Sequence, residues 1–119
     1  MMTVIDHESA PEIVRRPGYR RRPLAGGDDG FELTFEYHIV EPGSGAPPHY
    51  HPVDELLVIL EGEVEARLGD EVQRVTKNHT IAVSQGAHHS FTVVGTEPAR
   101  ILVFFPVADA FSDKYTTYL

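Results

Sequence analysis

Two histidines and a glutamate stand within seven consecutive positions of the segment GSGAPPHYHPVDELLVILEG, residues 43–62. In an extended strand successive side chains point to opposite faces, so His49 and His51 project to the same side. Glu55 follows four positions later, and imidazole nitrogens and carboxylate oxygens are common metal ligands in proteins. Three prolines flank these residues and exclude a helix, because proline fixes its own backbone and restricts the residue before it. The segment therefore predicts metal ligands on a strand or an extended loop.

The composition limits the class of protein. A chain of 119 residues is long enough for one domain with a real core and too short for two typical domains. Its 18 acidic and 10 basic residues give a net charge of −8, which argues against nucleic acid or an anionic membrane as the partner. It has no cysteine, so disulfides and thiolate ligands are excluded. Neither a signal peptide nor an apolar run of about 18 residues is visible, and we expect a cytoplasmic protein.

Residues 1–30 differ from the rest of the chain. They contain three prolines and the turn sequence AGGDDG without a sustained apolar period, and they predict an N-terminal arm with at most one short helix or strand. Half of the basic residues lie in this arm: Arg15, Arg16, Arg20, Arg21 and Arg22. Such a charge block is typical of a solvated or subunit-pairing arm, and a phosphate-binding patch is the alternative.

Short strands are predicted over residues 31–107. From 31 to 39 apolar and polar residues alternate, which indicates a half-buried strand. Its polar face, with Glu36 and His38, is expected in solvent, and contact with substrate at the barrel mouth is the alternative. Further strands are expected at 56–60, 63–68, 71–75, 81–83, 89–94 and 99–107, each ending in turn residues. This spacing favours an all-β, antiparallel sandwich or small barrel in a single domain, followed by a C-terminal tail at residues 108–119.

Two of these strands are continuously apolar, at residues 56–60 and 101–105. Continuous apolarity predicts that both faces of each strand are buried, one in the interior and the other against a second layer or subunit. We therefore expect a homodimer.

The spacing of the predicted ligands resembles a known family. The pattern G-x5-H-x-H-x3-E-x6-G is similar at every position to the first motif of the cupin superfamily, with Gly43, His49, His51, Glu55 and Gly62 at its fixed positions. The second cupin motif has Gly, Pro, Gly, His and Asn at fixed positions, and here only Gly86 and His89 agree with it. The similarity spans roughly residues 33–106. The sequences ELTFEYHIVEPGSGAPPH and TEPARILVFF, which surround the two motifs, look most like small single-domain cupins of the type-2 conserved-barrel kind. Such cupins are often described as quercetin-dioxygenase-like.

The resemblance implies an antiparallel jelly-roll barrel that holds one divalent metal ion, Fe, Mn, Ni, Cu or Zn, on His49, His51, Glu55 and His89. The missing residues of the second motif belong to turns, so their replacement affects loop geometry more than ligation. Alternation places His89 on the same strand face as Phe91 and Val93, which suits an inward ligand, and it places His88 on the opposite, surface side. A register slip of one residue would exchange the two histidines.

Alternation also predicts residues that line a substrate pocket, although it is equally consistent with the same residues packing in the hydrophobic core. These residues are Phe35, Tyr37, Leu57, Ile59, Phe91 and Phe104. A metal ion with open coordination positions favours a catalytic role over a purely structural one. Glu55 is a candidate general base. The favoured function is a metal-dependent oxygenase acting on a small aromatic or enolisable compound. The alternatives are a non-redox isomerase, lyase or polyketide cyclase, and a binding module that holds a small ligand without turnover.

Overall fold

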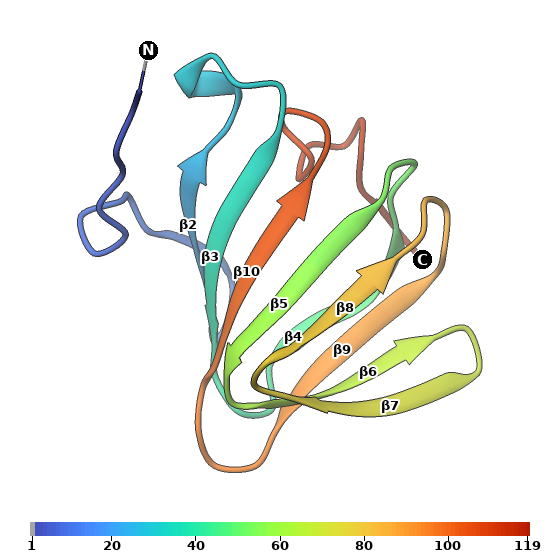
Figure 1. Cartoon of the computed structure of the whole chain (residues 1–119). Coiled ribbons are helices and arrows are strands. Elements are labelled where there is room, and N and C mark those ends of the chain that lie inside the picture. The colour runs from blue at the N-terminus through green and yellow to red at the C-terminus, as the bar shows by residue number, and fades with distance from the viewer. Residues whose placement is uncertain (1) are drawn as a thin grey trace.

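The computed structural model describes residues 2–119 as two antiparallel β-sheets that face each other (Figure 1). The strands are β1 (Ile13–Arg16), β2 (Tyr19–Ala25), β3 (Thr34–Val40), β4 (Gly45–Tyr50), β5 (Glu55–Glu61), β6 (Glu63–Leu68), β7 (Glu71–Thr76), β8 (His79–Val83), β9 (His89–Val94), β10 (Ala99–Phe105) and β11 (Thr117–Tyr118). A short 3-10 helix, η1, spans Gly27–Asp29. No helix within residues 2–119 is long and apolar enough to cross a membrane. The predicted all-β, antiparallel jelly-roll architecture is confirmed.

The strands are ordered β1-β2-β3-β10-β5-β8 in the six-stranded sheet and β11-β4-β9-β6-β7 in the five-stranded sheet. Their inner faces enclose a core whose largest fully buried apolar side chains are Tyr19, Phe105, Ile59, Ile101, Val40, Val64, Val93 and Val103. The apolar run of β10 pairs with β3 on one side and β5 on the other, which makes it the central strand of its sheet. The predicted strands from residue 56 to residue 105 therefore match β5 to β10 closely.

The N-terminal region is a correction to the sequence prediction. Residues 13–25 form β1 and β2, which extend the six-stranded sheet through the pairing of β2 with β3, and Tyr19 is only 1% exposed. The predicted arm is therefore wrong from residue 13 onward. The prolines that suggested it fit the strands locally: Pro17 lies in the turn between β1 and β2, and Pro23 lies beside a register irregularity of β2.

The arginine cluster belongs to the folded domain and is not a solvated arm. Arg20 and Arg22 contact Glu12 at 3.4 and 3.1 Å, and Arg21 contacts Glu36 at 2.7 Å. The first two pairs lie at the surface and contribute little each, whereas the third joins a nearly buried carboxylate. The sequence pattern missed these pairs because they depend on which strands become neighbours.

Strand β3 turns its polar face inward, opposite to the prediction. Glu36 is 4% exposed and His38 is fully buried, while Phe35 and Tyr37 lie half-buried on the outer face. The inward polar groups are all satisfied: Thr34 Oγ1, for example, donates to the Val107 carbonyl at 2.7 Å. Hydrophobic alternation predicted the wrong inner face for β3, because the polar side chains on its inner face are hydrogen-bonded and can therefore be buried.

The outer face of β5 is not covered within one chain. Leu56 and Leu60 are 40% and 38% exposed, although the continuous apolar run predicted burial on both faces. A second copy packed on this face would bury them, and the homodimer stays a prediction.

Gly45 is the first residue of β4 and lies opposite Thr92 of the neighbouring strand β9. A Cβ added to Gly45 would overlap the backbone carbonyl of Phe91, so the two strands could not keep their spacing. We predict that Gly45→Ala lowers the free energy of unfolding by about 2 kcal/mol, as overpacking does, in urea denaturation. Gly26→Ala is the control, because Gly26 is extended and its added Cβ would lie 3.4 Å from the Leu33 carbonyl oxygen. An equal loss of stability in both variants would contradict the clash.

Candidate metal centre

Three strands of the two sheets, β4, β9 and β5, bring the four predicted ligands together. His49 lies in β4 and pairs directly with His89, the first residue of β9. His51 follows β4 by one residue, and Glu55 begins β5 in the facing sheet. All four side chains are buried, and one candidate ligand atom from each lies within 4.8 Å of the others. The four residues therefore form a potential metal site.

Each histidine is oriented by a hydrogen bond from Nδ1 to a backbone carbonyl. The acceptors are Pro47 for His49 at 2.7 Å and Ala87 for His89 at 2.8 Å. His51 makes the same kind of bond to Tyr115 at 2.8 Å. A carbonyl can only accept, so Nδ1 of each ring carries a proton. A neutral ring then has its lone pair on Nε2, whereas His89, when protonated, donates from Nε2 to Glu55 Oε1 at 3.0 Å. The neutral ring with its proton on Nδ1 is the tautomer that binds a metal through Nε2.

The Nε2 atom of His51 is buried and is the single buried side-chain nitrogen or oxygen without a hydrogen-bond partner among residues 2–119. It lies 3.5 Å from Glu55 Oε1, which also receives His89 Nε2 at 3.0 Å. An unpartnered buried acceptor is costly in an apolar interior. A metal ion between these atoms would satisfy it, so the residues fit a divalent cation.

The ionisation of these groups follows from their contacts. Burial alone would raise the pKa of Glu55, but the imidazoles of His51 and His89 outweigh it and lower the pKa to about 2. Burial and the nearby His89 lower the pKa of His49 to about 4. Burial opposes charge on His89 too, yet its hydrogen bond to Glu55 leaves its pKa raised. A carboxylate with so low a pKa is a good ligand and a weak base, which favours the ligand role for Glu55 over the general-base role.

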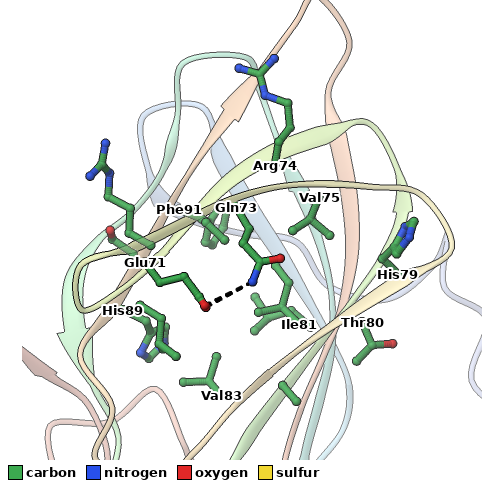
Figure 2. A pocket seen from close by; sticks show the side chains of 16 residues that line it. Glu71, Gln73, Arg74, Val75, His79, Thr80, Ile81, Val83, His89 and Phe91 are labelled. Atoms are coloured by element: carbon green, nitrogen blue, oxygen red, sulfur yellow. Dashed lines mark hydrogen bonds between the residues drawn. The ribbon is translucent and has the colours of Figure 1, made fainter.

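A cavity of about 410 Å³ opens between β7 and β8, the two sheet edges that no ladder joins (Figure 2). His89 is the one predicted ligand that lines it. The apolar part of its wall includes Leu57, Val83 and Phe91, and Figure 2 shows Val83 and Phe91 beside His89. Polar side chains line the β7 side and the start of β8: Arg67, Glu71, Gln73, Arg74, His79 and Thr80. The cavity thus offers an apolar wall next to one ligand and polar groups on another part of its lining.

The residues predicted as pocket walls lie in different parts of the fold. Leu57 and Phe91 line the cavity, while Ile59 is fully buried in the core. The assignment of Phe35, Tyr37 and Phe104 is wrong, because these side chains lie on the outer face of the six-stranded sheet. In β10 it is the next residue, Phe105, that points inward, with its ring 4.7 Å from that of His51.

The other histidines are placed as expected in part. His88 is exposed and stacks on Tyr50 with ring centroids 5.2 Å apart, so it faces away from the ligands. His79 is exposed, begins β8 and lines the cavity. His7 is exposed near the N-terminus, with its ring 5.9 Å from Tyr37.

A second buried polar cluster was missed by the sequence reasoning. Tyr19 and His38 Nδ1 are 2.5 Å apart, and His38 Nε2 lies 2.9 Å from Glu36 Oε1, whose other oxygen receives Arg21 at 2.7 Å. The carboxylate takes the Nε2 proton, so the phenol donates to Nδ1. The alternating Glu36 and His38 were the available signal, and reading their face as interior would have found the cluster.

Comparisons with known proteins agree with this geometry. The sequence matches the family model described as a cupin domain over residues 36–105, which is more than half of the chain. The protein therefore belongs to the cupin family.

Three known proteins are similar to this chain in sequence or in structure. The tetracenomycin polyketide synthase protein TcmJ of Streptomyces glaucescens is 31% identical over 90 residues, which are 74% of this chain and 60% of TcmJ. The polyketide cyclase RemF of Streptomyces resistomycificus has a TM-score of 0.78 and 25% identity, covering 96% of this chain and 89% of RemF. KdgF from Halomonas sp. has a TM-score of 0.80 at 18% identity, covering 94% of this chain and all of KdgF, which shows the shared fold.

We predict that His51→Ala loses most of the metal that the wild-type protein retains after reconstitution, because it removes one of four ligands. His88→Ala is the matched control, since His88 is an exposed histidine near the site. Elemental analysis of desalted protein measures both. Equal retention by the two variants would contradict the ligand assignment, and loss only in His88→Ala would reveal a register shifted by one residue.

The buried His38 predicts a pH dependence of stability. Burial lowers its pKa despite the opposing hydrogen bond that His38 donates to Glu36, so below about pH 6.5 the unfolded chain binds more protons than the folded protein. The stability associated with neutral His38 is therefore present above this pH and is lost as the pH falls. In His38→Gln the amide can accept from Tyr19 and donate to Glu36 without titrating. We expect the difference in unfolding free energy between wild type and His38→Gln to shrink from about pH 7 to about pH 5; a constant difference in denaturant titrations would contradict this.

Proposed function

We propose that this cupin is a divalent-metal-dependent enzyme that closes a ring in a small enolisable aromatic compound without redox chemistry, as a polyketide cyclase does. The observation that carries the proposal is the ligand set of three imidazoles and one carboxylate, one member of which, His89, lines an apolar cavity. The relatives named for polyketide synthesis support the same class of substrate.

The size and lining of the cavity support an aromatic substrate. Its volume of about 410 Å³ lies in the range of pockets that hold drug-sized ligands. Leu57, Val83 and Phe91 offer flat apolar contacts to a ring system, and His89 fixes the position of the ligand set relative to it. The polar groups of the β7 side, such as Glu71 and Gln73, are available to ketone or hydroxyl groups further along the same molecule.

The charges of the site support an enolate or phenolate. Glu55 is the one carboxylate among the four ligands, so it offsets only one positive charge of a divalent ion. Buried charges are normally compensated, and an enolate or phenolate oxygen of the substrate would supply the second negative charge.

The proposed step is an intramolecular aldol condensation. A carbon–carbon bond forms between an enol carbon and a ketone carbon, and the ketone oxygen leaves as water with two protons of the substrate. A bound divalent ion would act as a Lewis acid toward the enol and ketone oxygens. The chain contributes the oriented imidazoles and the apolar wall, which bring the two ends of the substrate together and exclude bulk water.

The ligand set also suits redox-active metals, so a metal-dependent oxygenase is the second candidate. The two functions differ in their use of oxygen, and a non-catalytic binding module differs from both in giving no product.

The test uses the metal-reconstituted protein with an aryl polyketone that can enolise, with and without oxygen, followed by mass spectrometry. We expect a product lighter by one water, formed equally without oxygen, by wild type and by the control His88→Ala, and at least a hundredfold slower by His89→Ala, a loss typical of a removed metal ligand or essential group. Oxygen uptake with a heavier, oxygenated product would support the oxygenase. Binding without any product, for each metal tried, would leave only the binding module.

A further inference from the structure

The C-terminal segment, residues 108–119, is part of the metal centre and not a free tail. In Figure 1 it runs from the end of β10 back to β4, the strand that carries His49. There β11 pairs Thr117 with Tyr50 and Tyr118 with His49, and the backbone N–H of Leu119 donates to the Pro48 carbonyl at 3.0 Å. The segment therefore adds an edge strand beside the ligand-bearing strand.

Thr116 contacts the Nδ1 atom of His51. It is buried, and its hydroxyl donates to the Ala110 carbonyl at 2.7 Å. A hydroxyl has one proton, so toward His51 Nδ1, 3.2 Å away, the same oxygen can only accept. The Tyr115 carbonyl, 2.8 Å from that nitrogen, can only accept as well. Two consecutive residues thus require the proton on Nδ1 and leave the lone pair of Nε2 facing Glu55.

Tyr118 secures the same segment against the other sheet. Its ring lies 5.7 Å from that of His49, and its hydroxyl accepts from Arg15 and Arg16, each at 3.0 Å. Arg16 also donates to the Gly45 carbonyl at the start of β4, at 2.8 Å. These arginines belong to β1, the edge of the six-stranded sheet, so the contact joins the two sheets beside His49.

We infer that Thr116 and Tyr118 are positioning residues of the metal centre: Thr116 fixes the metal-binding tautomer of His51, and Tyr118, held by Arg15 and Arg16, fixes the ring of His49. This inference rests on the proposed metal-dependent function of the site. Neither side chain is a ligand, and both act through a histidine. Partners of this kind typically change metal affinity by about 10- to 100-fold.

Metal affinity of the full-length protein tests the inference, with zinc as the probe and a chromophoric chelator as competitor. We expect Thr116→Val, which keeps the branched shape and removes the hydroxyl, to weaken zinc binding about tenfold, since the Tyr115 carbonyl still orients His51. Thr116→Ser should restore wild-type affinity. Thr117→Ala is the matched control, because Thr117 is an exposed neighbour in the same segment. Wild-type affinity in Thr116→Val would overturn the inference.

The tautomer of His51 supplies a readout that needs no metal. Nitrogen-15 NMR of the metal-free wild-type protein should show the proton on Nδ1, and Thr116→Val should raise the share of the Nε2–H form, which can donate to Glu55. An unchanged tautomer in a folded Thr116→Val protein would overturn the assignment even if zinc affinity fell. If wild-type protein binds no metal, the proposed function fails, while the tautomer still decides the role of Thr116.

Tyr118→Phe extends the test to His49, since it keeps the ring and removes the oxygen that Arg15 and Arg16 contact. We expect zinc affinity to fall severalfold, within the range seen for outer partners of metal ligands. Should Thr116→Val fail to fold, this variant carries the test alone. Wild-type affinity in Tyr118→Phe would then overturn the inference.

Discussion

The structure depends on satisfying three imidazoles and a carboxylate inside an apolar barrel. Unpaired, these groups would cost several kilocalories per mole, in the way that any buried polar group does. The chain meets this constraint with backbone carbonyls that lie outside regular ladders, at Pro47, Ala87 and Tyr115. Each carbonyl fixes a proton on Nδ1, and the four remaining ligand atoms converge with one nitrogen, His51 Nε2, left without a partner. The loops therefore define the site as much as the strands do.

The same constraint explains why β3 turns its polar face inward, opposite to the orientation that its hydrophobic pattern predicts. Tyr19, His38, Glu36 and Arg21 form a connected chain from the buried interior to the half-exposed guanidinium, and each polar atom in it has a partner. Because that chain is complete, the barrel tolerates a charged pair in its interior, and the aromatic residues of β3 are left to cover the outer face. Two polar clusters thus share one core and are separated by apolar side chains such as Phe91 and Phe105.

Much of the fold and nearly all of the ligand set could be predicted from the sequence, for a local reason. Strands β5 to β10 have either an apolar run or alternation, with turn residues between them, and His49, His51 and Glu55 have a fixed spacing along one segment. His89 followed from the resemblance to the second cupin motif, and its place on the same strand face as Phe91 agreed with that assignment. What failed was non-local: the inward face of β3 depends on Arg21 and Tyr19 of a neighbouring strand, and the role of residues 115–118 depends on a pairing with β4 across most of the chain. Alternation within a strand carries no information about such partners.

The two sheets meet along two borders, and only one of these borders is closed by side-chain contacts. On one side the edge strands β1 and β11 are joined through Arg15, Arg16 and the Tyr118 hydroxyl, beside His49. On the other side no ladder joins β7 to β8, and the cavity opens there with His89 on its wall. A structural metal clip would be closed on both sides, since its ligands need no access. The proposed enzyme would use this arrangement, because preorganised catalysis needs oriented ligands, such as His49 beside Tyr118, together with space for a substrate, such as the cavity beside His89.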